Sequence, residues 1–148
     1  MGLSGAFLCS KHFGKEMAAV GRGVILNISS DLGLIAPSQI LYSEQELPKN
    51  MQTVKPVTYS VIKHGIIGLT RYLSTYWSDR GVRCNCLAPG GIFNEHESEF
   101  KDKLSKLIPM GRMADIDEYK ATIIYMCSNA SSYMHGAIIS VDGGRTSW

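Results

Sequence analysis

The sequence predicts an α/β fold built on a parallel sheet. Three short apolar segments, within 23–33, 81–91 and 136–144, each end at a turn that contains glycine. Stretches with helical apolar spacing separate them, and strands joined through a right-handed helical crossover pair in parallel. In such a sheet ligands bind at the carboxyl ends of the strands. We therefore expect the functional residues to follow the strands.

The first helix and the first strand are the simplest elements to justify. Apolar positions at helical spacing predict a helix from Leu3 to about Ala19, and the turn at 21–23 ends it. The apolar run Val24 to Ile28 then predicts a buried strand. It delivers two hydroxyls, Ser29 and Ser30, at its carboxyl end.

The next helix is predicted from Thr58 to Arg80, with Gly81 in the left-handed conformation that commonly follows a helix. Its main apolar stripe has intervals of three and four residues and consists of Ile62, Ile66, Leu69, Leu73 and Tyr76. A second apolar stripe consists of Val61, Gly65, Gly68 and Tyr72. Two stripes predict two packing partners.

The second strand lies within 81–91 and the third within 136–144, with a helix between them. That helix is predicted from Asp115 to about Ser128, because Glu118 stands three residues after Asp115 and completes a capping box. The strands, helices and turns alternate with the rhythm of a single domain.

Composition excludes several classes of protein. The 148 residues are 45% hydrophobic and 19% charged, which is typical of a globular protein. A net charge of +2 with scattered basic residues argues against nucleic-acid binding, and no apolar run approaches the length of a membrane span. We expect a cytoplasmic protein with no membrane and no nucleic-acid partner.

The cysteines and histidines predict no metal site. Cys84 and Cys86 alternate along a strand and face the same side, at a spacing unlike that of zinc or thioredoxin motifs. Cys9 and Cys127 lie on predicted helices, so four reduced thiols are expected. The four histidines show no metal-ligand spacing.

Tyr59 and Lys63 form the most informative pair in the chain. Four residues apart on a helix, a phenol and an ammonium share one face. A free phenol ionises near pH ~10, and a neighbouring cation favours the phenolate, so such a pair is suited to proton transfer near neutral pH. A contact on a solvated helix surface is the alternative interpretation.

Three motifs in a fixed order give this pair its context. Ser30 has a glycine three residues on, Tyr59 and Lys63 form Tyr-x-x-x-Lys, and a Pro89–Gly90 turn precedes Ile92. Together they resemble the short-chain dehydrogenase/reductase family from Leu3 to Gly144.

The resemblance implies a role for each motif residue. Tyr59 would donate or accept the proton of the substrate hydroxyl, Ser30 would bind the carbonyl oxygen, and Lys63 would hold the ribose of NAD or NADP. The segment Pro89 to Ile92, including Gly90, would contact the nicotinamide. Asn94 takes the place of a threonine and can still form hydrogen bonds.

The resemblance also implies a partial domain. The glycine-rich pyrophosphate loop of the family, G-x-G-x-x-G, is missing, and Gly2 stands where the family has a catalytic asparagine. The expected fold is therefore a partial doubly wound, Rossmann-like parallel sheet that lacks the amino-terminal strands. Residues 1–148 would be the carboxyl-terminal catalytic part of one domain, with the dinucleotide-binding part absent.

Two loops carry the information on substrate. The segment between Ser30 and Tyr59 is more than twice its usual length in the family, and its excess, Ile35–Asn50, carries the polar residues Gln39, Tyr42, Glu44, Gln45 and Lys49. They suit a small, polar, sugar-like substrate, although a solvated loop would look the same. The charged segment Asn94–Asp102 matches the family's substrate lid. The chain is also similar to bacterial reductases of surface-sugar biosynthesis.

Two functions remain open. The first is an NAD(P)-dependent oxidoreductase acting on a polar alcohol or carbonyl. The second is a catalytically inactive fragment that serves as an interaction module with a full-length relative. Helices 3–19 and 58–80 resemble those of the family's subunit interface, so a homo-oligomer or association with such a relative is expected.

Overall fold

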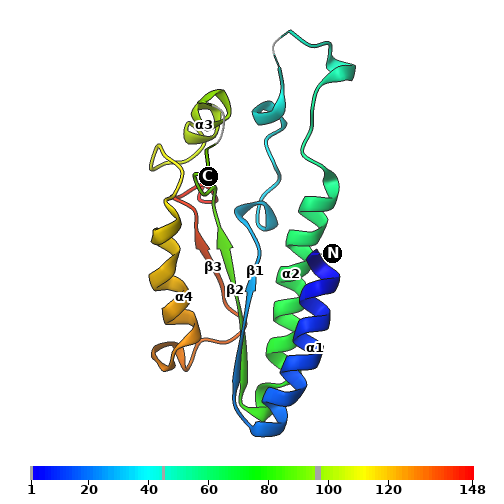
Figure 1. Cartoon of the computed structure of the whole chain (residues 1–148), viewed down its shortest axis with the longest axis vertical. Coiled ribbons are helices and arrows are strands. Elements are labelled where there is room, and N and C mark those ends of the chain that lie inside the picture. Colours follow the sequence, from blue (N-terminus) through cyan, green and yellow to red (C-terminus); the bar gives the residue numbers. More distant parts are fainter. Residues whose placement is uncertain (1, 45, 96–97) are drawn as a thin grey trace.

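The computed structural model describes residues 2–44, 46–95 and 98–148. Within them lies one parallel sheet in the order β1-β2-β3, with β1 at Gly23–Ile28, β2 at Val82–Pro89 and β3 at Ile138–Val141. The register places Ile28 opposite Leu87, and β2 is the central strand because β3 pairs with its second half. All three strands therefore present their carboxyl ends at the same edge (Figure 1).

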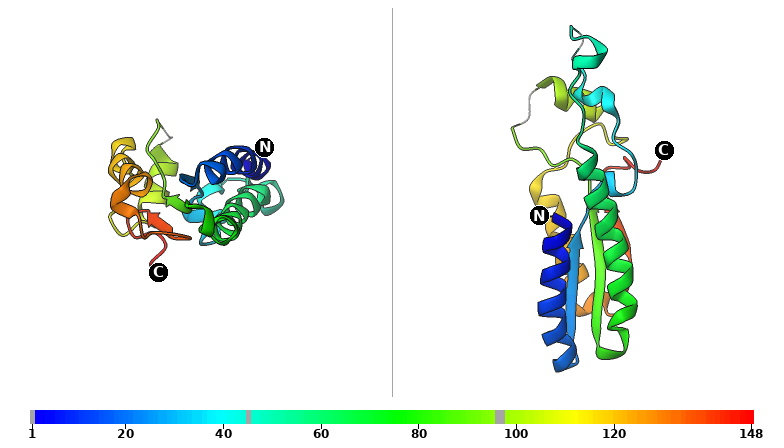
Figure 2. Two further views of the ribbon diagram at one scale, coloured as in Figure 1. Left: turned by 90° about the horizontal axis from the view of Figure 1, so that it is seen from below. Right: turned by 90° about the vertical axis from the view of Figure 1, so that its right-hand side faces the viewer.

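Helices cover both faces of the sheet. Helices α1 (Gly2–Val20) and α2 (Val57–Tyr76) lie together on one face, and α4 (Lys120–Cys127) lies on the other, as the end-on view in Figure 2 shows. This confirms the predicted α/β fold with its parallel sheet. Among the described residues, none of the helices combines the length and apolar character needed to cross a bilayer.

The core forms around β2. Cys84 packs with Leu73 and Trp77 on the α1–α2 side, whereas Leu87 packs with Met126 under α4. Cys86 also faces α2, so the two strand cysteines share one face as predicted. All four thiols are free, with Cys84 and Cys86 buried and Cys9 and Cys127 exposed.

Helix α2 ends earlier than predicted. It stops at Tyr76 instead of Arg80, and a 3-10 turn at Ser78–Arg80 leads to Gly81, whose φ of 68° confirms the left-handed conformation. The residue after the helix, Trp77, is buried. A Cβ on Gly14 would stand 2.2 Å from the Trp77 ring, so the indole occupies the space that glycine leaves on α1.

The second apolar stripe of α2 was predicted to pack against a partner, but neighbouring residues cover only part of it. The side chain of Leu3 on α1 lies over Gly65, where a Cβ would come within 2.8 Å of it. Val61 and Tyr72, in contrast, are 61% and 60% exposed. Tyr76 was predicted on the buried stripe but is exposed, and its ring stacks on that of Tyr72 at a centroid distance of 5.5 Å.

The segment before β3 differs from the prediction in two ways. The Glu118 carboxylate accepts the Asp115 N–H at 2.9 Å, as the capping box requires, but a 3-10 turn at Ile116–Tyr119 precedes α4. A short helix, α3 (Ser98–Ser105), lies where a loop was predicted at 94–102. An ion pair between Glu99 and Lys103 and the burial of Leu104 hold it together.

The segment between β1 and α2 stands with α3 above the carboxyl ends of the strands (Figure 1). Within the predicted insertion, Leu41 is buried against Leu104, Ile108 and Met113. The insertion is therefore anchored at Leu41 to the chain that follows β2, whereas most of the described residues of 44–50 are exposed. Gln45, which was predicted to face the substrate, and His96 lie outside the described residues.

Candidate active site

A cleft of about 350 Å³ opens at the carboxyl edge of the sheet. It is lined by the segment that follows β1, by the first turns of α2, by the turn after β2 and by Arg145 after β3. Six of the seven predicted site residues line it, namely Ser30, Tyr59, Lys63, Pro89, Gly90 and Ile92. Asn94 is exposed and stands outside this lining, so its contact with a cofactor stays a prediction.

The first turns of α2 are fixed against the turn after β1. Ser29 Oγ donates a hydrogen bond to the carbonyl of Lys63 at 2.7 Å. A Cβ on Gly33 would come within 2.9 Å of the same carbonyl oxygen, so glycine lets the turn approach the helix. This contact positions Tyr59 and Lys63 relative to Ser30.

Two ammonium groups lie beside the ring of Tyr59. Lys63 Nζ is 5.6 Å from the ring centroid, as the helical spacing led us to expect, and Lys55 Nζ is 4.2 Å from it. Lys63 Nζ donates to the carbonyl of Ile28 at 3.3 Å. Burial lowers the pKa of Lys63, while Cys86 acts in the opposite direction. Two cationic side chains therefore lie beside the Tyr59 ring.

Ser30 is held by its neighbour Asp31, and both side chains are buried. Ser30 Oγ donates to Asp31 Oδ1 at 2.7 Å and accepts the N–H of Leu32 at 3.2 Å. The proton of Ser30 is therefore directed at a carboxylate in the structure. For Ser30 to donate to a substrate oxygen, its hydroxyl has to rotate away from Asp31.

In the turn after β2, the backbone N–H of Ile92 points away from the strand pairing that surrounds it. Gly90 N–H donates to Val141 O at 2.9 Å, which continues the β2–β3 pairing. Ile92 forms a parallel bridge with Ala114 through the groups of Gly91 and Phe93. In a parallel bridge the N–H of the central residue points to the other side. Ile92 N–H is thus suited to bind a ligand such as a carboxamide.

The sequence interpretation missed three residues that line the cleft and gave a fourth only a general role. Asp31, Lys55 and Arg145 were not singled out, and Tyr42 was named only among the polar residues of the insertion. Arg145 could have been found, because it follows the last strand just as Ser30 follows the first. Lys55 had no such signal, since its position depends on how the insertion folds.

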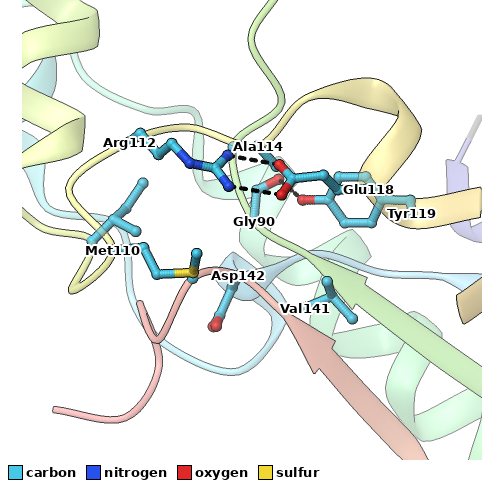
Figure 3. A pocket seen from close by; sticks show the side chains of 11 residues that line it. Gly90, Met110, Arg112, Ala114, Glu118, Tyr119, Val141 and Asp142 are labelled. Carbon is cyan, nitrogen blue, oxygen red and sulfur yellow. Dashed lines mark hydrogen bonds and ion pairs between the residues drawn. The ribbon is translucent and has the colours of Figure 1, made fainter.

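A second, smaller cavity of about 70 Å³ lies behind Gly90 and Gly91. In Figure 3 the guanidinium of Arg112 pairs with the Glu118 carboxylate across it. Both hydrogen bonds of this pair are 2.7 Å long. The polar groups satisfy one another and the space is small, so this cavity supports the turn after β2 and is not a substrate site.

No group of three or more histidine, cysteine or carboxylate side chains within the described ranges could hold a metal ion. His135 Nδ1 accepts the backbone N–H of Cys84 at 3.1 Å, which is a structural contact.

The fold and the cleft define a class, the doubly wound α/β proteins whose ligands bind at the carboxyl edge of a parallel sheet. A family model described as "Enoyl-(Acyl carrier protein) reductase" matches residues 1–146. The chain belongs to the short-chain dehydrogenase/reductase family.

Relatives in this family include dehydrogenases of sugar alcohols. The chain is 33% identical to a D-threitol dehydrogenase of Mycolicibacterium smegmatis, over 97% of this chain and 51% of the relative. It is 34% identical to a galactitol 2-dehydrogenase (L-tagatose-forming) of Cereibacter sphaeroides, over 99% of this chain and 54% of the relative. The chain thus spans about half the length of these relatives.

Solved structures show the same correspondence. A short-chain dehydrogenase of Leptospira borgpetersenii with bound NAD+ superposes with a TM-score of 0.88 at 32% identity, over 98% of this chain and 53% of that one. A gluconate 5-dehydrogenase of Burkholderia cenocepacia, in complex with NADP and tartrate, superposes with a TM-score of 0.81 at 31% identity, over 99% and 54%. The three-stranded sheet thus corresponds to about half of a Rossmann-type domain.

Proposed function

We propose that this chain supplies the catalytic half of an NAD(P)-dependent oxidoreductase, which transfers hydride to or from a polar, sugar-like alcohol or carbonyl. One observation carries the proposal: a single cleft brings Tyr59, Lys63 and Ser30 together with the turn from Pro89 to Ile92. A phenol beside two ammonium groups is suited to exchange a proton with a substrate hydroxyl.

The residues present fit the nicotinamide end of a dinucleotide. Lys63 Nζ has one hydrogen bond, to Ile28 O, within the described part of the chain, so it retains donors for a ribose hydroxyl. Ile92 N–H is directed away from Ala114 and suits a carboxamide oxygen. The nicotinamide supplies or accepts the hydride when bound. Neighbouring structures hold NAD+ or NADP, and we propose that this protein uses one of the two.

The protein's own residues would handle the proton and the substrate oxygen. Tyr59 would take the proton of the alcohol during oxidation and return it during reduction, and the ammonium groups of Lys55 and Lys63 lie beside its ring. Ser30 contacts the same substrate oxygen. The polar lining by Asp31 and Tyr42 favours a hydroxylated substrate, in keeping with the sugar alcohols that relatives are named for.

We also propose that residues 1–148 form the carboxyl-terminal part of a single domain, whose dinucleotide-binding part lies outside the printed sequence. The share of the relatives' length that the chain covers supports this, and so does the lack of a G-x-G-x-x-G motif in the chain. A cytoplasmic location is part of the proposal. The four free thiols are in keeping with it.

Tyr59→Phe in the full-length protein that contains this chain tests the proposal. Turnover of a sugar alcohol with NAD+ or NADP+ should be abolished, while cofactor binding stays nearly intact, because only the proton-transferring hydroxyl is removed. Tyr72→Phe, an exposed tyrosine on the same helix, is the matched control and should retain activity. Wild-type activity in Tyr59→Phe would make Tyr59 a surface residue without a catalytic role.

A second candidate function is that of an interaction module, and the uncovered apolar stripe on α2 favours it. Val61 and Tyr72 are exposed there, although the same helix packs closely on α1 at Gly65. A second copy or a full-length relative could cover this stripe. Sedimentation of the 148-residue chain with a full-length relative tests this second function: an interaction module forms a complex with the relative, and the absence of a complex would refute it.

A further inference from the structure

Arg145 is a buried cation that forms no ion pair with any of the described residues. Its side chain lines the candidate active site and is only 6% exposed. Within residues 2–44, 46–95 and 98–148, Nε has no hydrogen-bond partner, and no carboxylate lies within 4.0 Å of the guanidinium. Burial of an unpaired charge is costly, so such a group calls for an anion that the protein itself does not provide.

The nearest acid in sequence, Asp142, is fully engaged elsewhere. Its carboxylate accepts the hydroxyls of Ser140 and Thr146 at 2.8 and 2.6 Å and the N–H groups of Gly144 and Thr146, both at 3.0 Å. Burial raises the pKa of Asp142, but these hydrogen bonds outweigh it and the pKa is lowered. Asp142 therefore fixes the turn that carries Arg145 and does not neutralise it.

Asp31, the acid that lines the cleft, does not neutralise the charge of Arg145 either. It accepts the hydroxyl of Ser30 at 2.7 Å and the N–H of Leu32 at 2.8 Å. Against this single carboxylate stand three cations of the cleft lining, Lys55, Lys63 and Arg145. The described part of the cleft thus has an excess of positive charge, which favours an anionic ligand.

Tyr42 links Arg145 to the catalytic pair. Burial raises the pKa of the Tyr42 phenol, Asp31 and Tyr59 raise it further, and Arg145 lowers it. Tyr42 is thus within electrostatic reach of both Tyr59 and Arg145. Tyr42, Tyr59 and Arg145 all line the same cleft, so a ligand that fills it lies against both Arg145 and Tyr59.

We propose that Arg145 binds the carboxylate of the substrate, which is a hydroxy acid of the sugar-acid type rather than a neutral polyol. The planar guanidinium matches a carboxylate through two parallel hydrogen bonds. The hydroxyl that is oxidised would then lie at Tyr59 and Ser30. This inference rests on the proposed oxidoreductase function, because it names the substrate class of the same cleft.

Saturation-transfer NMR tests the inference without turnover and on protein in any state of association. The probes are D-gluconate and D-glucitol, which have the same carbon chain but differ in the carboxylate. The wild-type protein should bind gluconate at least tenfold more tightly than glucitol, which is the lower range for a charge-assisted hydrogen bond. Equal binding of the two probes, or a preference for glucitol, would overturn the inference before any variant is made.

Variants then assign the preference to Arg145. Arg145→Gln should remove it by weakening gluconate binding at least tenfold and leaving glucitol unchanged, and Arg145→Lys should retain part of it. Arg80→Gln, an exposed arginine, is the matched control and should bind as the wild type does. An unchanged gluconate affinity in Arg145→Gln, with circular dichroism confirming its fold, would refute the role of Arg145.

The same variants in the full-length protein separate this inference from the proposed function. Arg145→Gln should raise KM for gluconate at least tenfold and leave kcat within about twofold, because the guanidinium binds substrate and moves no proton. If instead Arg145→Gln loses affinity for NAD+ or NADP+ and keeps its affinity for gluconate, Arg145 serves the cofactor. A protein that binds gluconate through Arg145 but turns over no alcohol would leave the inference standing and refute the proposed function.

Discussion

Two adjacent serines in this protein have different duties. Both line the cleft, but Ser29 donates to the carbonyl of Lys63 and holds α2 in place, whereas Ser30 donates to Asp31. The spacing to Gly33 is what distinguished them in the sequence, and the catalytic role of Ser30 stays a prediction.

Ser30→Ala should lower kcat of the full-length enzyme by a factor of about 30 to 1,000, which corresponds to the ~2–4 kcal/mol that one oxyanion-type donor contributes. Ser29→Ala is the matched control. It loses a hydrogen bond worth about 1 kcal/mol of folding stability and should change kcat far less. Steady-state kinetics and denaturant unfolding of both variants measure the two effects, and a larger loss of kcat in Ser29→Ala would reverse the assignment.

Glu118 makes the stability of the turn after β2 dependent on pH. Hydrogen bonds from the Arg112 guanidinium and from the Asp115 N–H hold the pKa of Glu118 at about 2, below its ordinary value of 4.5. A carboxyl group whose pKa is depressed on folding stabilises the native state above its unfolded pKa. That contribution is lost as the pH falls from about 4.5 towards 2.

Glu118→Gln should therefore be less stable than the wild type above pH 4.5, with the difference shrinking as the pH approaches 2. Urea unfolding at a series of pH values measures it. Glu99→Gln, which breaks an exposed pair with Lys103, is the matched control and should change the stability by less than about 1 kcal/mol. A difference between Glu118→Gln and the wild type that does not change with pH would contradict the assigned cause.

At the residue scale, the sequence predicted the cleft residues that belong to motifs. It missed the residues whose position in the cleft depends on how a loop folds. Tyr59 and Lys63 share a helix face, so their spacing was sufficient. Lys55 and Tyr42 reach the cleft only because Leu41 packs on α3 and the chain after it, and no local pattern encodes that contact. Arg145 follows a strand and was within reach of the same reasoning that located Ser30.

At the scale of elements, the sequence pattern predicted the positions of the strands and of α1 closely. It did not predict where α2 ends or where α4 begins. Trp77, the residue after α2, packs on Gly14, and such a tertiary contact leaves no trace in helical periodicity. The same holds for α3, whose Leu104 is buried by the insertion. Contacts between distant segments lie at these boundaries.

Glycines on the helices offer a test of this packing. Gly14→Ala should destabilise the protein by about 1–3 kcal/mol, because the new methyl would overlap the buried Trp77 ring, even though alanine is the better helix former. Gly5→Ala and Gly68→Ala are matched controls with nothing within 4 Å, and each should stabilise by up to about 1 kcal/mol. Chemical unfolding of the three variants measures these changes. A stabilised Gly14→Ala would show that Trp77 does not pack there.

At the scale of the whole molecule, the sheet order makes β1 an edge strand. In the part of the chain that the structure describes, β1 pairs with β2 alone, and the apolar side chains of Phe13 and Met17 on α1 lie next to its other side. An edge strand with unpaired backbone groups is a template for association. The sequence indicated this edge only through the family resemblance, since strand order is not encoded in any one segment.

The 148-residue chain alone should therefore self-associate or require a partner that covers β1 and the exposed stripe of α2. Sedimentation velocity at several concentrations measures this. The paired variant Val61→Lys with Tyr72→Lys should reduce association if the helix surface drives it, and leave it unchanged if the strand edge does. A stable, monodisperse monomer at all concentrations would show that neither surface recruits a partner.

Two of the four thiols are exposed and two are buried. The rate at which the buried pair is labelled therefore measures how often the sheet opens. A thiol reagent should label Cys9 and Cys127 at once and leave Cys84 and Cys86 intact, since burial raises the pKa of Cys84 to about 12 and also raises that of Cys86. The third and fourth labels then require β2 to leave its place between β1 and β3. Their rate reports how often the centre of the molecule opens under native conditions, and its slowing on addition of a ligand gives the binding energy with no enzymatic assay.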